Sequence, residues 1–353
     1  MQKKINPGRL LLITFIVLIS YFFLFPYPLG RELHLKPVWA KELRAGNFNG
    51  SSENEPITWL KMGDFFGYFN LSGDFYYVGR VFFDVALSNT GFVNFAKITE
   101  NLVFIDNKGR FLFSFQSYGY PVLPDKGEGI FTVNTDLCGI RELNREGELL
   151  WQKEFATPIT ALSIKEDYLL IGLLEGRFEL LDREGLLEFE FIPTGSRIET
   201  ILGVAQMQRR LAVISGIDPQ QLSIFEKKDQ SFAPVFSRNL DTDFRREVMI
   251  DFSDDGRYLI LEGPNEVSVL DMNNRSSYSL PTSGRLKNIS AANEILITLS
   301  EVGGSTIFQV SGLPNQQLYS ELISTEDVFL RQIDEHLFLA IDGHLVRIDV
   351  LEG

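Results

Sequence analysis

Two acidic pairs are the residues of this sequence whose type and spacing most resemble metal ligands. Asp254 and Asp255 stand directly before Gly256, and Asp241 and Asp243 are separated by one threonine. Carboxylate oxygens bind hard cations, but a calcium loop needs further oxygen ligands that neither stretch supplies. Asp followed by Gly is also typical of a tight β-turn. We therefore predict a turn at the first pair and a solvated loop at the second, with no metal at either.

Few residues of this chain offer histidine or cysteine chemistry. The sequence contains three histidines and a single cysteine. His336 and His344 lie eight residues apart on a predicted hairpin, where two imidazoles could hold a metal, but no third ligand accompanies them. We therefore expect surface histidines. Cys138 precedes a glycine at the start of a predicted strand, which favours a buried structural thiol over a nucleophile.

Glycine-containing turns and one tryptophan are the remaining candidates for a ligand site. Gly216, Gly303 and Gly304 fall in predicted turns between strands, and no helix of the kind that follows a phosphate-binding loop is expected after them. Trp151 follows a hairpin glycine and is expected to pack between repeat units rather than to hold a ligand. The sequence thus predicts no catalytic residue, no cofactor-binding residue and no metal ligand.

The elements that carry these residues repeat along the chain with a period of 38 residues. Three turns of the form Asp/Asn-x-x-Gly end at Gly109, Gly147 and Gly185, and an apolar strand end precedes each. Asp or Asn at the first turn position hydrogen-bonds its own backbone, and glycine accepts the left-handed conformation at the fourth. Each turn is therefore predicted to join two antiparallel strands.

A second landmark keeps the same register. Gly91, Gly129 and Asp167 each lie 18 residues before one of the turn glycines, and each begins an apolar stretch. Four short antiparallel strands in about 40 residues are typical of one blade of a β-propeller. In the unit with the clearest pattern, the four predicted strands are residues 159–164, 168–173, 177–181 and 186–191.

The predicted fold is all-β: a β-propeller of seven blades, each of four antiparallel strands. Residues 64–353 supply about 41 residues for each of seven blades, within the range of known propeller repeats. The C-terminal stretch supplies only three strands, so an N-terminal strand from residues 65–81 is expected to complete the last blade and close the ring. Six or eight blades stay open as alternatives, because the first blade boundary is uncertain. A pair of β-sandwiches is the runner-up fold.

Composition excludes several functional classes. The chain has 353 residues, of which 44% are hydrophobic and 23% charged, as in a folded globular protein. Its net charge of −14 argues against nucleic-acid binding, which needs a basic surface. A single thiol cannot form an internal disulfide or a cysteine-pair redox site.

The N-terminal residues predict a membrane segment. Residues 10–29 contain no charged side chain and are long enough for a helix to cross a bilayer. Basic residues precede them, so the N-terminus is expected in the cytoplasm and the rest outside it, in a bacterial periplasm. A cleaved signal peptide is the alternative, although its apolar stretch would normally be shorter. The predicted organisation is a cytoplasmic basic tail (1–9), a transmembrane anchor (10–29), a tether (30–56) and the propeller (57–353).

The unit at residues 148–185 resembles the repeat of quinoprotein-type (PQQ-like) propellers, in which a tryptophan follows a hairpin glycine and later glycines precede the next turn. Residues 252–259 (FSDDGRYL) are similar to a strand entry of WD-repeat and TolB-type propellers, with Asp254 in place of their proline. The resemblance covers two or three blades and implies the propeller fold. The residues that match the quinoprotein-type repeat are Gly147, Trp151, Gly172, Gly176 and Gly185.

The resemblance also bears on cofactors. Quinoprotein dehydrogenases bind their cofactor with adjacent cysteines and a calcium site, and Cys138 has no neighbouring cysteine. We therefore expect no PQQ and no other cofactor. The chain is closer in style to the cofactor-free propeller lipoprotein of the outer-membrane barrel-assembly machinery, which uses this repeat for binding.

These expectations combine into one predicted function. We expect a membrane-anchored, extracytoplasmic propeller that acts as a non-enzymatic protein-binding scaffold in a cell-envelope complex. Its partners are expected to be envelope proteins, together with the membrane through residues 10–29, and no nucleic acid. Extended peptides or strand edges are plausible ligands of the propeller faces. The alternative is an enzyme or small-ligand sensor at the mouth of the central channel, which convergent ionisable side chains would mark, since fold alone decides neither.

Overall fold

A computed structural model describes residues 33–48, 55–96, 99–116, 119–124, 129–165, 167–229 and 231–352. Every regular element in these residues is a β-strand, and none of them lies in a helix. The chain divides into two units. Pro37–Asp349 form the larger unit, and the described part of the smaller unit consists of residues 33–36 and 350–352, which are strand ends.

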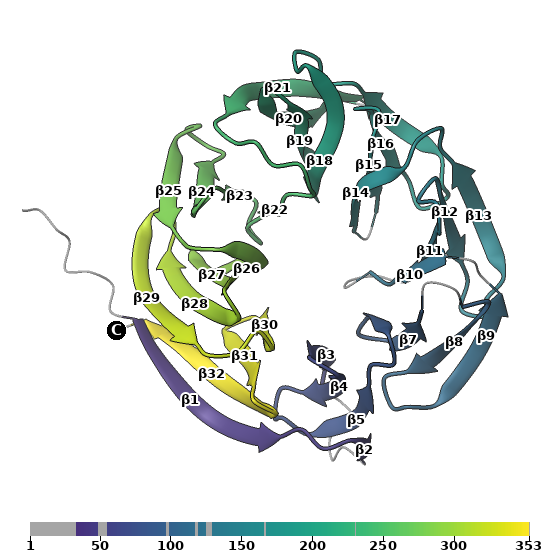
Figure 1. The fold of residues 1–353 in the computed structure, drawn as a ribbon, viewed down its shortest axis with the longest axis vertical. Helices are drawn as coiled ribbons and strands as arrows, with labels where there is room; N and C mark the ends of the chain where they lie inside the picture. Colours follow the sequence, from purple (N-terminus) through teal and green to yellow (C-terminus); the bar gives the residue numbers. More distant parts are fainter. Residues whose placement is uncertain are drawn as a thin grey trace, which may run out of the picture. The chain divides into compact units, whose positions relative to one another are not determined.

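The larger unit is a ring of four-stranded sheets (Figure 1). The described residues form eight such sheets, which we call blades I–VIII in chain order. The predicted all-β propeller is confirmed, but the predicted number of seven blades is wrong. In blades II–VII the four strands follow one another in sequence, with the first strand of each blade on the inner side of the ring and the last on its outer rim (Figure 1).

Blades II–IV carry the 38-residue repeat. Blade II consists of β6 (Asp84–Leu87), β7 (Gly91–Phe95), β8 (Asn101–Asp106) and β9 (Phe111–Gln116). Blade III consists of β10 (Gly119–Val122), β11 (Ile130–Asn134), β12 (Gly139–Leu143) and β13 (Leu149–Glu154). Blade IV consists of β14 (Ile159–Ile164), β15 (Leu169–Leu173), β16 (Phe178–Leu181) and β17 (Leu187–Phe191), close to the four predicted strands.

Blades V–VII have lost the strict repeat but keep the strand order. Blade V consists of β18 (Ile198–Met207), β19 (Arg210–Ile217), β20 (Gln220–Lys228) and β21 (Ser231–Leu240). Blade VI consists of β22 (Ile250–Phe252), β23 (Tyr258–Gly263), β24 (Glu266–Asp271) and β25 (Ser277–Pro281). Blade VII consists of β26 (Arg285–Ala292), β27 (Ile295–Val302), β28 (Ser305–Gly312) and β29 (Gln316–Ile323).

The first and last blades each take their outer strand from the N-terminal segment. Blade I has the order β2-β5-β4-β3, and blade VIII has the order β1-β32-β31-β30. The strands of blade I are β2 (Gly46–Asn47), β3 (Ile57–Met62), β4 (Phe65–Asn70) and β5 (Phe75–Arg80). Those of blade VIII are β1 (Leu33–Glu42), β30 (Val328–Ile333), β31 (His336–Ile341) and β32 (His344–Glu352).

This arrangement explains the wrong blade number. An N-terminal strand does complete the last blade, but it is β1, which lies in the segment 30–56 that was predicted as a tether. Residues 65–81, predicted to supply that strand, instead form β4 and β5 of a separate blade. In this blade β4 pairs with β3, and β5 pairs with β4. The last blade therefore closes with a strand from farther upstream, which leaves residues 57–80 to build an eighth blade.

The predicted turns have the predicted chemistry. In all three repeats the first turn side chain accepts hydrogen bonds from backbone amides two and four residues later, at 2.8–3.0 Å. The fourth residue is a glycine at a φ of 77–82°, a conformation that a side chain would strain. Each turn therefore reverses the chain tightly and starts the outermost strand of its blade at the same place.

The apolar core lies between neighbouring blades. Between blades IV and V, for example, Phe178 and Leu180 pack with Ile201, Val213 and Phe225, all of them buried. Phe178 and Phe225 meet edge to face, with ring centroids 5.1 Å apart. Aromatic rings thus fill the space between sheets, as the phenylalanine-rich composition suggests.

The predicted membrane topology is not supported. No helix long and apolar enough to span a bilayer occurs in the part of the chain that the structure describes. The predicted transmembrane anchor (10–29) and basic tail (1–9) lie outside the described residues. We therefore do not retain the single-pass topology, or the localisation that was inferred from it.

Candidate functional site

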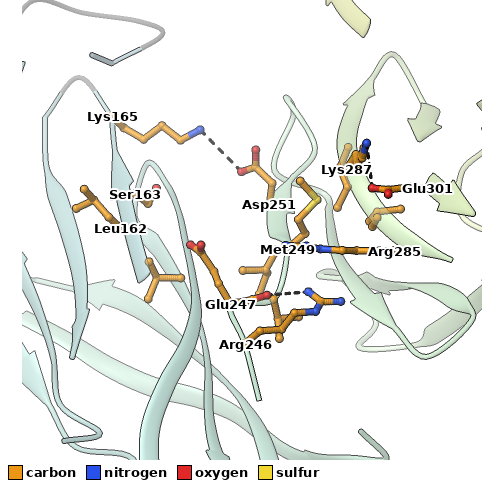
Figure 2. A pocket seen from close by; sticks show the side chains of 15 residues that line it. Leu162, Ser163, Lys165, Arg246, Glu247, Met249, Asp251, Arg285, Lys287 and Glu301 are labelled. Atoms are coloured by element: carbon orange, nitrogen blue, oxygen red, sulfur yellow. Dashed lines mark hydrogen bonds and ion pairs between the residues drawn. The ribbon is translucent and has the colours of Figure 1, made fainter. Parts of the chain in front are cut away.

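A cavity of about 590 Å³ lies on the inner side of the ring (Figure 2). Its wall comes from the inner strands of blades IV–VII, from Lys165 after β14, from residues 246–249 before β22 and from one residue of β27, so four blades contribute. The wall mixes apolar and charged side chains. The charged ones are Lys165, Arg246, Glu247, Asp251, Arg285, Lys287 and Glu301.

Arg246 is held in place by a buried carboxylate. Its guanidinium donates two hydrogen bonds to Glu262, at 2.6 and 3.0 Å, and the Glu262 side chain is only 4% exposed. A third bond runs from Arg246 to the backbone oxygen of Glu247, at 2.8 Å. A bidentate pair of this kind is strong and fixes the guanidinium plane. Arg246 therefore anchors the segment before β22 and is not available to a ligand.

Two further cations of the wall are also paired with carboxylates. Lys287 lies 2.9 Å from Glu301, and Lys165 lies 3.8 Å from Asp251, as the dashed lines in Figure 2 show. The second pair bridges β14 of blade IV and β22 of blade VI. These pairs neutralise most of the charge in the wall.

Glu247 and Arg285 remain without such a partner. Within the described residues, no hydrogen bond or ion pair involves the Glu247 carboxylate or the Arg285 guanidinium. The Glu247 side chain is exposed, and desolvation by the protein beside it raises the pKa of its carboxyl group. In Figure 2 the Glu247 carboxylate points toward the side of Ser163, whereas Arg285 extends from β26 toward Met249. With respect to the described residues, the cavity thus presents one unpaired anion and one unpaired cation.

A second feature lies on the outer rim of blades II–IV. The outer strands β9, β13 and β17 each begin with a β-bulge, at which one residue has no partner on the neighbouring strand. The residue without a partner is Leu112 in blade II, Leu150 in blade III and Glu188 in blade IV. A bulge redirects side chains, so consecutive residues can both face solvent. We call the exposed apolar residues at these starts the rim stripe: Phe111, Leu112, Leu149, Leu150, Leu186 and Leu187.

Contacts between blades connect the rim stripe. The turn glycine of blade III, Gly147, lies against Phe113 of β9, and that of blade IV, Gly185, lies against Trp151 of β13. The Trp151 indole donates to the backbone oxygen of Arg183 in the same turn, at 2.9 Å. Each bulge is therefore fixed beside the turn that precedes the next one, and β9, β13 and β17 lie on the outer rim of three adjacent blades (Figure 1). The rim stripe thus extends over these three blades.

The surroundings of the rim stripe are acidic on blades III and IV. Glutamates are exposed beside the apolar pairs, both in the turns and along β17. Lys153 and Arg183, which could offset this charge, form ion pairs with the buried Glu179 and Glu142 at 2.7 and 2.8 Å. The exposed glutamates are Glu146, Glu148, Glu184, Glu188 and Glu190.

The acidic pairs singled out in the sequence form turns and loops. Asp255 accepts hydrogen bonds from the Ser253 hydroxyl (2.6 Å) and the Arg257 amide (3.0 Å) in the turn between β22 and β23. Asp243 lies in the loop between β21 and β22, 3.8 Å from Arg245. No group of three side chains able to hold a metal occurs anywhere in the described residues.

The histidines and the cysteine do not form a site either. His336 pairs with Asp349 at 3.0 Å and His344 with the backbone oxygen of Asp342, so they lie at opposite ends of one hairpin. Cys138 is partly buried, and desolvation with the charges of two nearby carboxylates raises the pKa of its thiol. Such a thiol is a poor nucleophile at neutral pH.

The remaining candidates are structural. Trp151 packs between blades III and IV, and Gly303 and Gly304 lie at the predicted hairpin turn. The prediction of a turn at Gly216 is wrong, because this glycine belongs to β19. The sequence missed both the cavity and the rim stripe. A signal for the rim stripe was present, because a pair of apolar residues follows each turn glycine. The cavity left no such signal, since its residues come from four blades.

Comparisons with known proteins agree with this architecture. A family model described as "beta-propeller protein" matches residues 1–353. The chain belongs to this family. An uncharacterized protein of Treponema pallidum (strain Nichols) is 22% identical to this β-propeller protein over 364 residues, which cover 99% of this chain and 96% of that protein.

Two solved structures share the fold of the β-propeller protein. BamB from Moraxella catarrhalis superposes with a TM-score of 0.64 and 13% identity, over 90% of this chain and 100% of that one. The computationally designed Ika8 protein gives a TM-score of 0.63 and 15% identity, over 88% of this chain and 98% of that one. The resemblance to PQQ-like propellers is thereby confirmed at the level of the fold.

Proposed function

We propose that this β-propeller protein is a non-enzymatic scaffold that binds another protein through the rim stripe. The observation that carries the proposal is that exposed apolar pairs recur where the outer strand begins in three adjacent blades. In blade IV the pair is shifted by one residue toward the turn, and the residue at its bulge is Glu188. Apolar side chains that gather on a surface, rather than occurring singly, are typical of interaction sites.

The acidic surroundings indicate the chemistry of the partner. Exposed glutamates flank the rim stripe on blades III and IV, and the chain as a whole is strongly acidic. A partner surface with apolar residues at its centre and lysine or arginine at its edge would match both features. Because the repeat resembles that of cofactor-free envelope propellers, we include a cell-envelope complex as the setting of this partner.

Site-specific photo-crosslinking in the native cell tests the proposal. p-Benzoylphenylalanine in place of Leu112, Leu150 or Leu186 should crosslink to one and the same protein. The matched control is Leu322, which is 60% exposed on the outer strand β29 of blade VII and should give no such product. Crosslinks from Leu322 alone, or different products from the three rim positions, would contradict a single docking surface.

A second candidate function is the binding of a small ligand at the cavity. The observation that favours it is the pair of unpartnered charges, Glu247 and Arg285, in a cavity of about 590 Å³. Pockets of roughly 300–1,000 Å³ with a few convergent polar groups are typical of small-molecule sites. A binding measurement on the purified protein tests this candidate independently of the rim stripe.

A further inference from the structure

The free charges of the cavity differ from all its other charges. Arg246, Lys165 and Lys287 each have a carboxylate within 4 Å, whereas Arg285 has none among the described residues. Glu247 likewise lacks a cation, and desolvation is the only cause that shifts its pKa. Both side chains are exposed at the wall of the cavity, so a ligand of opposite charge can reach each of them without breaking an existing ion pair.

The two charges require a ligand of a definite kind. Glu247 and Arg285 carry opposite charges and do not pair with each other, so a single small ion cannot pair with both. A ligand must instead carry a cationic and an anionic group at separate places. The wall also contains apolar residues, Val204, Met249 and Ile250 among them, so part of the ligand should be apolar as well.

We propose that the cavity binds a short peptide with free termini. Its terminal carboxylate pairs with the Arg285 guanidinium, whose two parallel donors match a carboxylate. Its terminal ammonium pairs with the Glu247 carboxylate, and its apolar side chains lie against Met249 and its neighbours. The inference rests on the second candidate function, ligand binding at the cavity, and names the class of ligand.

The test combines changes in the ligand with changes in the protein. The probe is the tripeptide Ala-Leu-Ala, compared with its N-acetylated and its C-amidated forms, by isothermal titration calorimetry on the purified full chain. Capping either end should weaken binding by about 10-fold or more, because each cap removes one charge-assisted contact.

Two variants assign each end of the peptide to its residue. Arg285→Gln should bind the free and the amidated peptide equally, and should still discriminate against the acetylated one. Glu247→Gln should show the reverse pattern. The control is Lys287→Gln, because Lys287 lines the same cavity but already pairs with Glu301. It should leave the affinity within about twofold. The thermal midpoint of each variant verifies folding before titration.

The possible outcomes distinguish the peptide ligand of the cavity from protein docking at the rim stripe. Binding of all three peptides with equal affinity, or no binding at millimolar peptide, would refute the peptide ligand. Discrimination that both variants leave intact would refute the assignment to Glu247 and Arg285. Failure of either kind leaves the rim stripe untouched, because crosslinking at Leu150 does not depend on the cavity. Conversely, loss of the rim crosslinks would not alter the peptide titrations.

Discussion

Blades II–IV and blades V–VII have the same strand order but differ in how they present side chains. In blades II–IV the outer strands have five or six residues and begin at the same Asx turn and bulge, so one surface feature occurs three times. In blades V–VII strands reach ten residues and the turns differ from one another. The wall of the cavity comes mainly from these divergent blades.

The same fold can therefore present two kinds of site. Repetition multiplies a simple feature along the rim, which suits an extended partner surface. Divergence lets several blades each contribute a different side chain to one place, which suits a small ligand. The two sites also differ in their chemistry. The rim presents exposed apolar groups, whereas the wall of the cavity is stabilised by the ion pair between Arg246 and the buried Glu262.

The largest expected effect concerns the ion pair between Arg246 and Glu262. Arg246→Ala leaves Glu262 buried without its bidentate partner, and removing one member of such a pair is strongly destabilising. We expect the free energy of unfolding to fall by about 3 kcal/mol, measured by urea denaturation at pH 7. Adding Glu262→Gln to this variant should recover part of the loss, because the unpaired charge is removed.

The corresponding change near the rim should be milder. Arg183 pairs with the buried Glu142 at 2.8 Å, and Glu142 also accepts a hydrogen bond from the Trp151 indole at 2.8 Å. Glu262 likewise keeps other donors, the backbone amides of Met249 and Leu286 at 3.3 and 3.4 Å, so the contrast rests on protonation. Burial already raises the pKa of the Glu142 carboxyl, so the group can take up a proton when Arg183 is lost. Arg183→Ala should therefore destabilise less than Arg246→Ala, and an equal loss would contradict the contrast between the two regions.

The next effect distinguishes a close contact from backbone strain alone. Gly185 has a φ of 77°, and a Cβ there would lie 2.5 Å from the Trp151 ring. Gly303, in blade VII, has a φ of 55° with no atom within 4 Å of the added Cβ. Gly185→Ala should destabilise by about 2–4 kcal/mol, from strain and overpacking, and Gly303→Ala by about 1 kcal/mol, from strain. Similar midpoints of thermal unfolding would show that the Trp151 contact contributes nothing.

The regular half of the molecule was predictable because its structure is local. Asp or Asn and Gly at fixed positions define the turn by themselves, and the strands of blade IV lie within one residue of their predicted starts. The exposure of the apolar pair after Gly147 was not predicted, although Leu149 and Leu150 are adjacent. A bulge depends on the pairing of two strands, and pairing is not visible in one strand alone.

The other features depend on contacts between distant parts of the chain. The polar segment that contains β1 and β2 has little apolar alternation, and its strands are stabilised by edges that blades I and VIII provide. The sequence therefore left eight blades as an alternative to the seven that we predicted. The cavity depends in the same way on residues from 162 to 301, which only the closed ring brings together.

A smaller effect tests the environment of Glu247. Burial raises its pKa above the ordinary 4.5, so the folded state binds this proton more tightly than the unfolded state does. Stability is therefore lost as the pH rises from about 4.5 through the folded-state pKa, because the unfolded state releases its proton first. Glu247→Gln removes this term, so the variant should gain thermal stability over the wild type at pH 7 but not at pH 4. Parallel pH profiles would show that Glu247 is not desolvated.

Substitutions in the rim stripe should have the smallest effect on stability. A small effect on stability together with loss of the partner would separate binding from folding. Phe111, Leu149 and Leu187 are 64%, 53% and 47% exposed, so replacing them with serine removes little buried apolar area. Each change should alter the free energy of unfolding by about 0.5 kcal/mol or less. The triple serine variant should therefore unfold at nearly the same urea concentration, yet lose the partner that wild type captures by crosslinking at Leu150. Leu322→Ser should change neither property. A large loss of stability in the triple variant would instead place these residues in the core, which would remove the reason to regard the rim as a docking surface.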